Sequence, residues 1–135
     1  MSRGVRLRID RAALRANLRV ARETAAGARV MAVVKADGYG HGLLQVAAAL
    51  ADGVDAFAVT DLAEAGELRH AGFTQRIVLL QGIFAAADLE RAAAQRCEVV
   101  IHTEWQLEAL ARARLSAPLT VWIKVDTGMH RLGFP

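Results

Sequence analysis

VMAVVK, residues 30–35, is a short and nearly continuous apolar run that ends in a lysine. Four further runs of this kind follow at intervals of 21 to 25 residues: DAFAVT from residue 55, RIVLL from 76, CEVVI from 97 and LTVWIKVD from 119. Because apolar residues fill each run instead of alternating with polar ones, the runs are typical of parallel strands covered on both faces. The sequence therefore predicts five parallel strands.

Helical patterns fill the intervals between the runs, over residues 42–52, 61–71, 85–95 and 103–115, and a further helix is expected over 11–23. Residues that start and stop helices stand where this pattern needs them: Asp10 and Asp61 as N-caps, Thr103 and Gln106 as a capping box, and Gly53 and Gly72 as C-terminal stops. The alternation of strand and helix predicts a βα repeat.

Five strands and four crossover helices suit either a doubly wound open sheet or an incomplete (β/α)8 barrel of the TIM type, both of them α/β folds. A full barrel takes about 250 residues, so a chain of 135 residues would hold rather more than half of one. No Pro-rich or Ser-rich linker interrupts residues 10–135, which predicts one unit over that range. Residues 5–9, VRLRI, alternate apolar and basic side chains and suit a strand that belongs elsewhere.

The composition suits one domain with a sizeable core, since 54% of the residues are hydrophobic. The N-terminus has no apolar segment of the kind that a signal peptide needs, and no stretch approaches the ~20 apolar residues of a membrane span, so a cytoplasmic protein is expected. The single cysteine, Cys97, cannot form an internal disulfide. It heads an apolar run, which favours a buried structural thiol.

The formal net charge of +3 raises the question of nucleic-acid binding, because four arginines recur at helical spacing near the start: Arg11, Arg15, Arg19 and Arg22. No aromatic side chains interleave with these arginines, and no nucleic-acid signature is present. A solvated helix face is therefore favoured over a nucleic-acid site.

Lysine is rare in this chain, since 15 of the 17 basic residues are arginine and the only lysines are Lys35 and Lys124. A lysine amine can be neutral and nucleophilic, whereas a guanidinium group keeps its proton in proteins. Lys35 ends the first run and leads into ADGYGHG, residues 36–42. A glycine-rich turn before a helix suits a phosphate, and a lysine beside it suggests the Schiff base of pyridoxal phosphate. Without further knowledge, a surface or ion-paired lysine is the alternative.

A second group of polar residues lies in VWIKVDTGMHRLGF, residues 121–134. By strand alternation Lys124 shares a face with Trp122 and Asp126, and a buried ammonium group there must be paired, neutralised or modified. Arg131 follows in the loop after this strand, on the same face as Lys35. The alternative interpretation is a Lys124–Asp126 ion pair and an exposed Arg131.

AVVKADGYGHG, residues 32–42, and KVDTGMHRLGF, residues 124–134, resemble the two N-terminal signature regions of alanine racemases, which are fold type III pyridoxal-phosphate enzymes. The resemblance covers essentially the whole chain, including IHTEWQLEAL, residues 101–110. It implies the incomplete barrel over residues 10–135, a smaller C-terminal β domain that residues 1–9 would join, and a homodimer. It also implies an isomerase that interconverts L-alanine and D-alanine through a pyridoxal-phosphate aldimine by a two-base mechanism and supplies D-alanine for peptidoglycan.

The same resemblance implies roles for individual residues. Lys35 would hold the cofactor and act as the base on the D-alanine face, and Tyr39 would contact the cofactor phosphate. Arg131 would lie beside the cofactor and the substrate carboxylate, Met129 would line the substrate side, and Lys124 stands at a position that many members carry as a carbamate. No metal is expected.

Two alternatives stay open beside an alanine racemase. One is a catalytically incomplete fragment that at most binds pyridoxal phosphate, because the family's second base lies in its C-terminal half. The other is a broad-specificity amino-acid racemase. Neither a nucleic-acid partner nor a membrane partner is expected.

Overall fold

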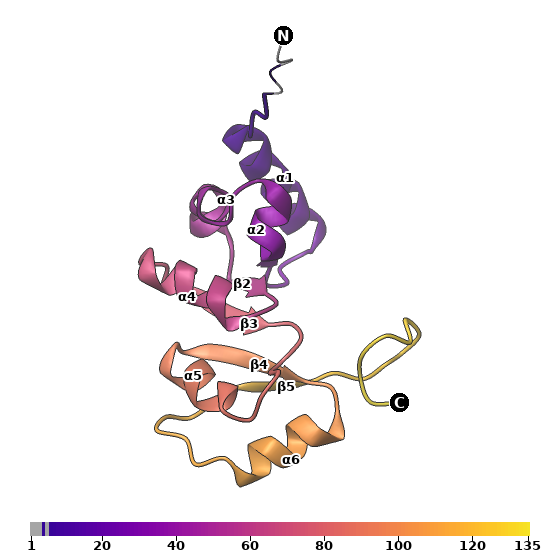
Figure 1. Cartoon of the computed structure of the whole chain (residues 1–135). Helices are drawn as coiled ribbons and strands as arrows, with labels where there is room; N and C mark the ends of the chain where they lie inside the picture. The colour runs from indigo at the N-terminus through magenta and orange to yellow at the C-terminus, as the bar shows by residue number, and fades with distance from the viewer. Residues whose placement is uncertain (1–3, 5) are drawn as a thin grey trace.

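A computed structural model describes residue 4 and residues 6–135 (Figure 1). Its elements are, in chain order, α1 (Arg11–Thr24), β1 (Met31–Val33), α2 (Lys35–Gly40), α3 (Leu43–Leu50), the 3-10 turn η1 (Ala51–Gly53), β2 (Ala56–Val59), α4 (Leu62–His70), β3 (Arg76–Leu79), α5 (Asp88–Ala94), β4 (Cys97–Ile101), α6 (Glu104–Arg112) and β5 (Val121–Ile123). The predicted strands and helices are present, and the ends of each lie within three residues of the predicted ends.

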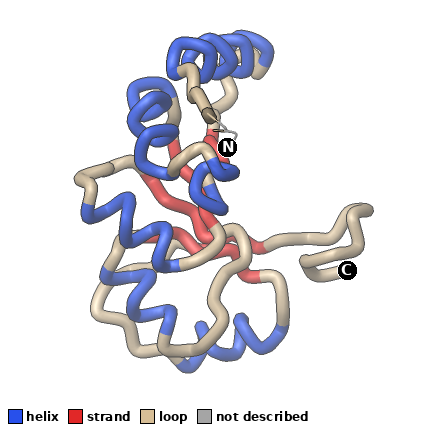
Figure 2. The backbone as a smooth tube through the Cα atoms, turned by 45° about the horizontal axis from the view of Figure 1, so that its top comes forward, coloured by secondary structure: helices blue, strands red, loops and turns tan. Residues whose placement is uncertain are grey.

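The five strands form one parallel sheet in the order β1-β2-β3-β4-β5. Each strand therefore pairs with the next one along the chain. A doubly wound open sheet reverses its strand order partway, so the sequential order favours the arc of an incomplete barrel. Figure 2 shows the strands in the middle of the molecule with the helices along one side of them.

Two apolar clusters lie on the two faces of the sheet. The larger one packs the strands against the helices, with Phe57, Ile77, Leu79 and Ile101 buried within it. The smaller one consists of Ala58, Val78 and Val100, with Met31 and Leu80 packed against them. This second cluster belongs to the inner face of the arc, because strand residues alternate between the two faces.

The helix starts follow the predicted capping at two of three positions. The carboxylate of Asp10 accepts from the backbone N–H groups of Ala12 and Ala13, and the carboxylate of Asp61 likewise caps α4. The capping box predicted from Thr103 to Gln106 is wrong, because the Thr103 side chain makes no capping bond. Gln106 instead accepts from the His102 N–H at 2.9 Å.

Gln106 departs from its predicted role because its side chain is buried and used elsewhere. Its amide nitrogen donates to the carbonyl oxygens of Gln81 and Ile83, at 3.1 Å each. These bonds tie the start of α6 to the loop after β3. A contact between segments more than 20 residues apart has replaced a local one.

Cys97 begins β4 and is buried, as predicted for a structural thiol. Burial raises the pKa of the Cys97 thiol to about 11, and the nearby Arg69 offsets only part of that effect. The thiol is therefore protonated and unreactive near neutral pH.

The strand predicted over residues 5–9 falls partly outside the described residues. Val5 and residues 1–3 lie outside the described residues, and residues 6–9 form no regular element. The assignment of residues 1–9 to a separate β domain stays a prediction. Within residues 4 and 6–135, no helix combines the length and the apolar character needed to cross a bilayer.

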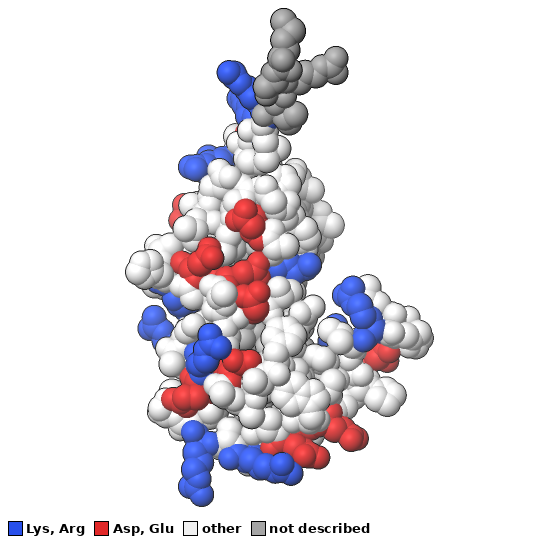
Figure 3. All heavy atoms as spheres, viewed as in Figure 1, with Lys and Arg blue, Asp and Glu red and all other residues white. Residues whose placement is uncertain are grey.

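The arginines of α1 are solvent-exposed, as the solvated-face interpretation predicts. Arg22 lies 3.5 Å from the Asp55 carboxylate, which ties α1 to the start of β2. On the face drawn in Figure 3, lysine and arginine side chains are scattered and form no continuous patch. This face thus offers no basic surface of the kind that nucleic acids require.

Candidate active site

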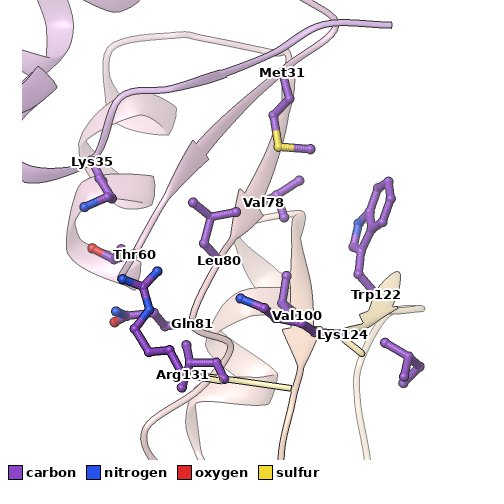
Figure 4. Close-up of a pocket in the computed structure, with 12 residues that line it drawn as sticks. Met31, Lys35, Thr60, Val78, Leu80, Gln81, Val100, Trp122, Lys124 and Arg131 are labelled. Carbon is purple, nitrogen blue, oxygen red and sulfur yellow. The ribbon is translucent and has the colours of Figure 1, made fainter. Parts of the chain in front are cut away.

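A pocket of about 550 Å³ opens at the C-terminal ends of the strands (Figure 4). Its lining consists of Met31, Lys35, Thr60, Val78, Leu80, Gln81, Val100, Trp122, Ile123, Lys124, Arg131 and Leu132. The apolar members form the inner face of the arc, and the polar members follow the strands. Three of the predicted site residues, Lys35, Lys124 and Arg131, thus meet at one cavity.

Lys35 lies two residues beyond the end of β1, and the chain after it forms a left-handed turn. Ala36, Asp37 and Tyr39 have φ values of 53°, 54° and 57°, and Gly38 has 62°. A left-handed helical conformation costs roughly 1–2 kcal/mol for each residue that carries a Cβ atom, so the turn needs support from outside. The Lys35 amine is therefore directed by a backbone conformation that the local sequence alone does not favour.

Asp37 supplies much of that support. Its carboxylate accepts from the Leu43 N–H at 2.7 Å, and its carbonyl oxygen accepts from the Gly42 N–H at 2.8 Å. These bonds join the turn to the start of α3. The imidazole of His41 adds a contact between its Nδ1 and the Gly38 carbonyl oxygen at 3.1 Å.

The start of α3 does not offer its Leu43 N–H to an anion, and the phosphate site expected in the glycine-rich loop stays a prediction. The Leu43 N–H at the start of α3 is already bonded to a carboxylate, which would repel a phosphate. The three glycines of the loop do not line the pocket. Gly38 is instead buried against α3, where an added Cβ would lie 3.1 Å from a Val46 methyl group.

Tyr39 and Met129 lie outside the pocket lining. The Tyr39 ring is 58% exposed, and the Lys35 Nζ lies 5.1 Å from its centre. Tyr39 thus contacts the lysine directly. Met129 is 73% exposed on the loop after β5, so its predicted place on the substrate side is not formed by this part of the chain alone.

The loop after β5 folds back on itself and brings Arg131 to the pocket. The Asp126 N–H donates to the Phe134 carbonyl oxygen, and the Phe134 N–H donates to the Lys124 carbonyl oxygen, at 2.7 Å and 2.9 Å. Gly133 allows this return, because it has a φ of 121° and an added Cβ would lie 2.8 Å from the Asp126 nitrogen.

Asp126 holds this loop and does not pair with Lys124. Its carboxylate accepts from the N–H groups of His130 and Gly128, at 2.9 Å and 3.0 Å, and lies 3.0 Å from the His130 imidazole. The two backbone N–H groups lower the pKa of Asp126. The alternative of a Lys124–Asp126 ion pair is therefore wrong. His130 is a partner of Asp126.

The three cations of the pocket have no ion-pair partner within the described part of the chain, although the Lys35 Nζ lies over the Tyr39 ring. Lys35, Lys124 and Arg131 form no ion pair there, and their side chains donate no hydrogen bond to another protein group. In Figure 4 the Lys35 amine and the Arg131 guanidinium lie around Thr60, and Trp122 lies on the far side of the cavity. Such an arrangement suits an anionic ligand.

A different charged group occupies the opposite, N-terminal end of the inner face. Arg76 forms a two-point ion pair with the Glu98 carboxylate, and the Trp122 indole N–H donates to the same carboxylate at 2.7 Å. Burial by itself would raise the pKa of Glu98, but the bonds from Arg76 and Trp122 outweigh it and lower the pKa. Trp122 also lines the pocket, so it belongs to both groups of residues.

Several lining residues were missed in the sequence, although a signal for two of them was present. Thr60 follows the end of β2 directly and Gln81 lies two residues beyond β3, just as Lys35 follows β1. Applying the strand-end rule to every strand would have found both. Within residues 4 and 6–135, no cluster of three or more His, Cys, Asp or Glu side chains could hold a metal ion.

Comparison with known families agrees with this geometry. The family model described as alanine racemase, N-terminal domain, matches residues 9–135. This chain belongs to the alanine racemase family. Among curated relatives, the alanine racemase of Halorhodospira halophila is 63% identical over the whole chain, and the catabolic alanine racemase of Pseudomonas aeruginosa is 54% identical over 98% of it.

Solved structures of family members share the fold. The biosynthetic alanine racemase of Pseudomonas aeruginosa matches 94% of the chain with a TM-score of 0.89 and 45% identity. A histidine racemase from Leuconostoc mesenteroides matches 93% with a TM-score of 0.81 and 32% identity. The chain spans about 37% of the length of the two curated relatives, and 36% and 34% of the two solved chains. It therefore corresponds to a part of the alanine racemase barrel domain.

Proposed function

We propose that this chain provides the cofactor lysine and one side of the active site of a pyridoxal-phosphate-dependent alanine racemase. The observation that carries the proposal is the pocket with three unpartnered cations, one of which, Lys35, is a lysine placed at a strand end. The reaction would interconvert L-alanine and D-alanine and supply D-alanine for peptidoglycan. Family membership supports this assignment.

The residues present fit pyridoxal phosphate. This cofactor carries an aldehyde that bonds to a lysine amine, a phenolic oxygen and a phosphate, and when bound it supplies an electron sink for the substrate. Lys35 would hold the aldehyde carbon, Arg131 would lie by the phenolic oxygen, and Tyr39 would contact the phosphate. The unpaired cations offset the negative charge of such a ligand.

Other steps of the reaction would also depend on residues of this chain. The Lys35 amine would move the proton on the D-alanine face of the substrate Cα, and Arg131 would bind the substrate carboxylate. Met129 would line the substrate side once the rest of the protein surrounds it. The opposite base would come from a segment outside these 135 residues, which alone would be catalytically incomplete.

Lys124 would act as a carbamate. The carbamate would replace an unpaired, half-buried cation by an anion, which could accept two hydrogen bonds from Arg131 and hold it in place. A carbon resonance from ¹³C-labelled bicarbonate, present in the protein and absent from Lys124→Met, would support this role. The same labelling in both proteins would contradict it.

A second candidate is a racemase that accepts larger amino acids. Its support is the likeness to the histidine racemase of Leuconostoc mesenteroides, whose chain shares this fold at 32% identity. We further propose a cytoplasmic homodimer, as in the family. Substrate profiling with alanine and histidine would separate the two candidates.

The direct test is a titration of the chain with pyridoxal phosphate, followed by borohydride reduction and peptide mapping. Lys35→Ala should lose the absorbance band of the lysine-bound aldehyde and the reduced label. Lys124→Ala is the matched lysine variant, since it removes the only other lysine and any lysine label that remains in it reports Lys35 alone. Equal labelling of the wild type and Lys35→Ala would overturn the proposal.

A further inference from the structure

Glu64 lies in the first turn of α4, and its two carboxylate oxygens face two different segments. Oε2 accepts from the N–H and the hydroxyl of Thr60, at 3.1 Å and 3.2 Å. Oε1 accepts from the N–H of Asp37 at 3.4 Å. One side chain therefore joins the end of β2 to the left-handed turn that follows Lys35.

Both segments that Glu64 joins belong to the pocket. Thr60 is part of the lining, and Asp37 lies two residues after Lys35 in the turn that directs the lysine. The turn's own bonds from Gly42 and Leu43 to Asp37 hold its far side against α3. On the side nearer to β2, the Val34 N–H before Lys35 donates to the Ala58 carbonyl oxygen at 2.9 Å, and Glu64 holds the turn after Lys35.

We propose that Glu64 is a positioning residue for Lys35. By fixing the left-handed turn against the end of β2, its carboxylate sets the direction from which the lysine amine enters the pocket beside Thr60. The left-handed backbone at Ala36, Asp37 and Tyr39 is unfavourable for residues that carry a Cβ atom, so it needs bonds to other segments. The inference rests on the proposed role of Lys35 as the cofactor lysine.

A purely structural role in starting α4 is the competing explanation, and the chain offers a variant that isolates it. Asp61 caps α4 through the N–H groups of Ala63 and Glu64 but contacts no atom of the turn. Asp61→Ala should therefore weaken the helix start without moving Lys35. Glu67→Ala is a second control, because this exposed glutamate lies one turn further along the same helix.

The first measurement needs no cofactor. Amide hydrogen exchange at Asp37 should accelerate about tenfold in Glu64→Ala, because the N–H loses its acceptor and the turn opens more often. In Asp61→Ala and Glu67→Ala the rate should change less than about twofold. An unchanged rate in Glu64→Ala, or an equal rise in Asp61→Ala, would overturn the inference.

The second measurement is the yield of pyridoxal phosphate that borohydride traps on Lys35, per mole of chain, found by peptide mapping at a limiting cofactor concentration. Glu64→Ala should lower this yield about tenfold, while Asp61→Ala should leave it within about twofold of the wild type. Glu64→Gln should give an intermediate yield, because one amide oxygen can replace only one of the two carboxylate acceptors.

The two proposals fail in different ways. If the wild type and Lys35→Ala carry the same label, the proposed function fails, and the exchange rate at Asp37 still tests whether Glu64 holds the turn. If the wild type is labelled on Lys35 and Glu64→Ala gives the same yield, the proposed function stands and Glu64 is not a positioning residue.

Discussion

Charged side chains lie at both ends of the inner face of the sheet, but only those at one end have partners of opposite charge within the protein. At the N-terminal end, Arg76, Glu98 and Trp122 bond to one another. At the C-terminal end, Lys35 and Lys124 have no anionic partner among the described residues. The charges at the N-terminal end are paired within the protein, whereas the cations at the C-terminal end are stabilised only when an anion binds. The contrast separates the structural part of the barrel interior from its functional part.

The largest effect expected from this contrast is a loss of stability when Glu98 is removed. Glu98→Ala leaves Arg76 and the Trp122 N–H without their acceptor and should lower the free energy of unfolding by about 3 kcal/mol. Urea denaturation of the wild type and of Glu98→Ala measures this loss of stability.

Glu108→Ala is the matched control for that measurement. Glu108 pairs with Arg112 at 3.1 Å on the exposed side of α6, where both side chains are largely in solvent. Its loss should cost less than about 0.5 kcal/mol. Similar costs for Glu98→Ala and Glu108→Ala would mean that the inner pair is no more important than a surface pair.

The same carboxylate should give the stability of the chain an acid-sensitive component. The pKa of Glu98 is lowered in the folded chain, so its stabilising effect is full above the ordinary glutamate value of about 4.3 and is lost as the pH falls through the folded value. The difference in unfolding free energy between wild type and Glu98→Gln should be constant near neutral pH, at about 2 kcal/mol, and should shrink below about pH 4. A difference that grows on acidification would have the wrong sign for a lowered pKa.

The strands and the meeting of the cationic residues could be predicted because both follow from patterns within short segments. Apolar runs reported the strands, and parallel strands place their C-terminal ends at one edge, which brought Lys35 and Lys124 together. Arg131 could be placed on the same face because it follows the fifth strand, and the family resemblance then added its role beside the cofactor and the substrate carboxylate.

The remaining features depend on contacts between distant segments. The left-handed turn after Lys35 runs against the local preference of Ala36 and Asp37, and it is held by Glu64, 27 residues after Asp37. Gln106 has the sequence position of a capping residue, yet bonds to Gln81 and Ile83 decide its orientation. In both cases the residue that determines the conformation lies more than 20 positions away in the sequence, so the local pattern could not indicate it.

The smallest expected effect comes from the unpaired end and has the opposite sign. Lys124→Met removes a half-buried ammonium group that has no ion-pair partner in the described chain, and keeps most of its apolar stem. In carbonate-free buffer without cofactor, the free energy of unfolding should therefore rise by about 0.5 kcal/mol. Urea denaturation of both proteins measures the change, with Arg114→Met as a control for the removal of an exposed cation. A loss above about 1 kcal/mol would show that Lys124 already has a partner, and the two ends of the inner face would then not differ in the way described.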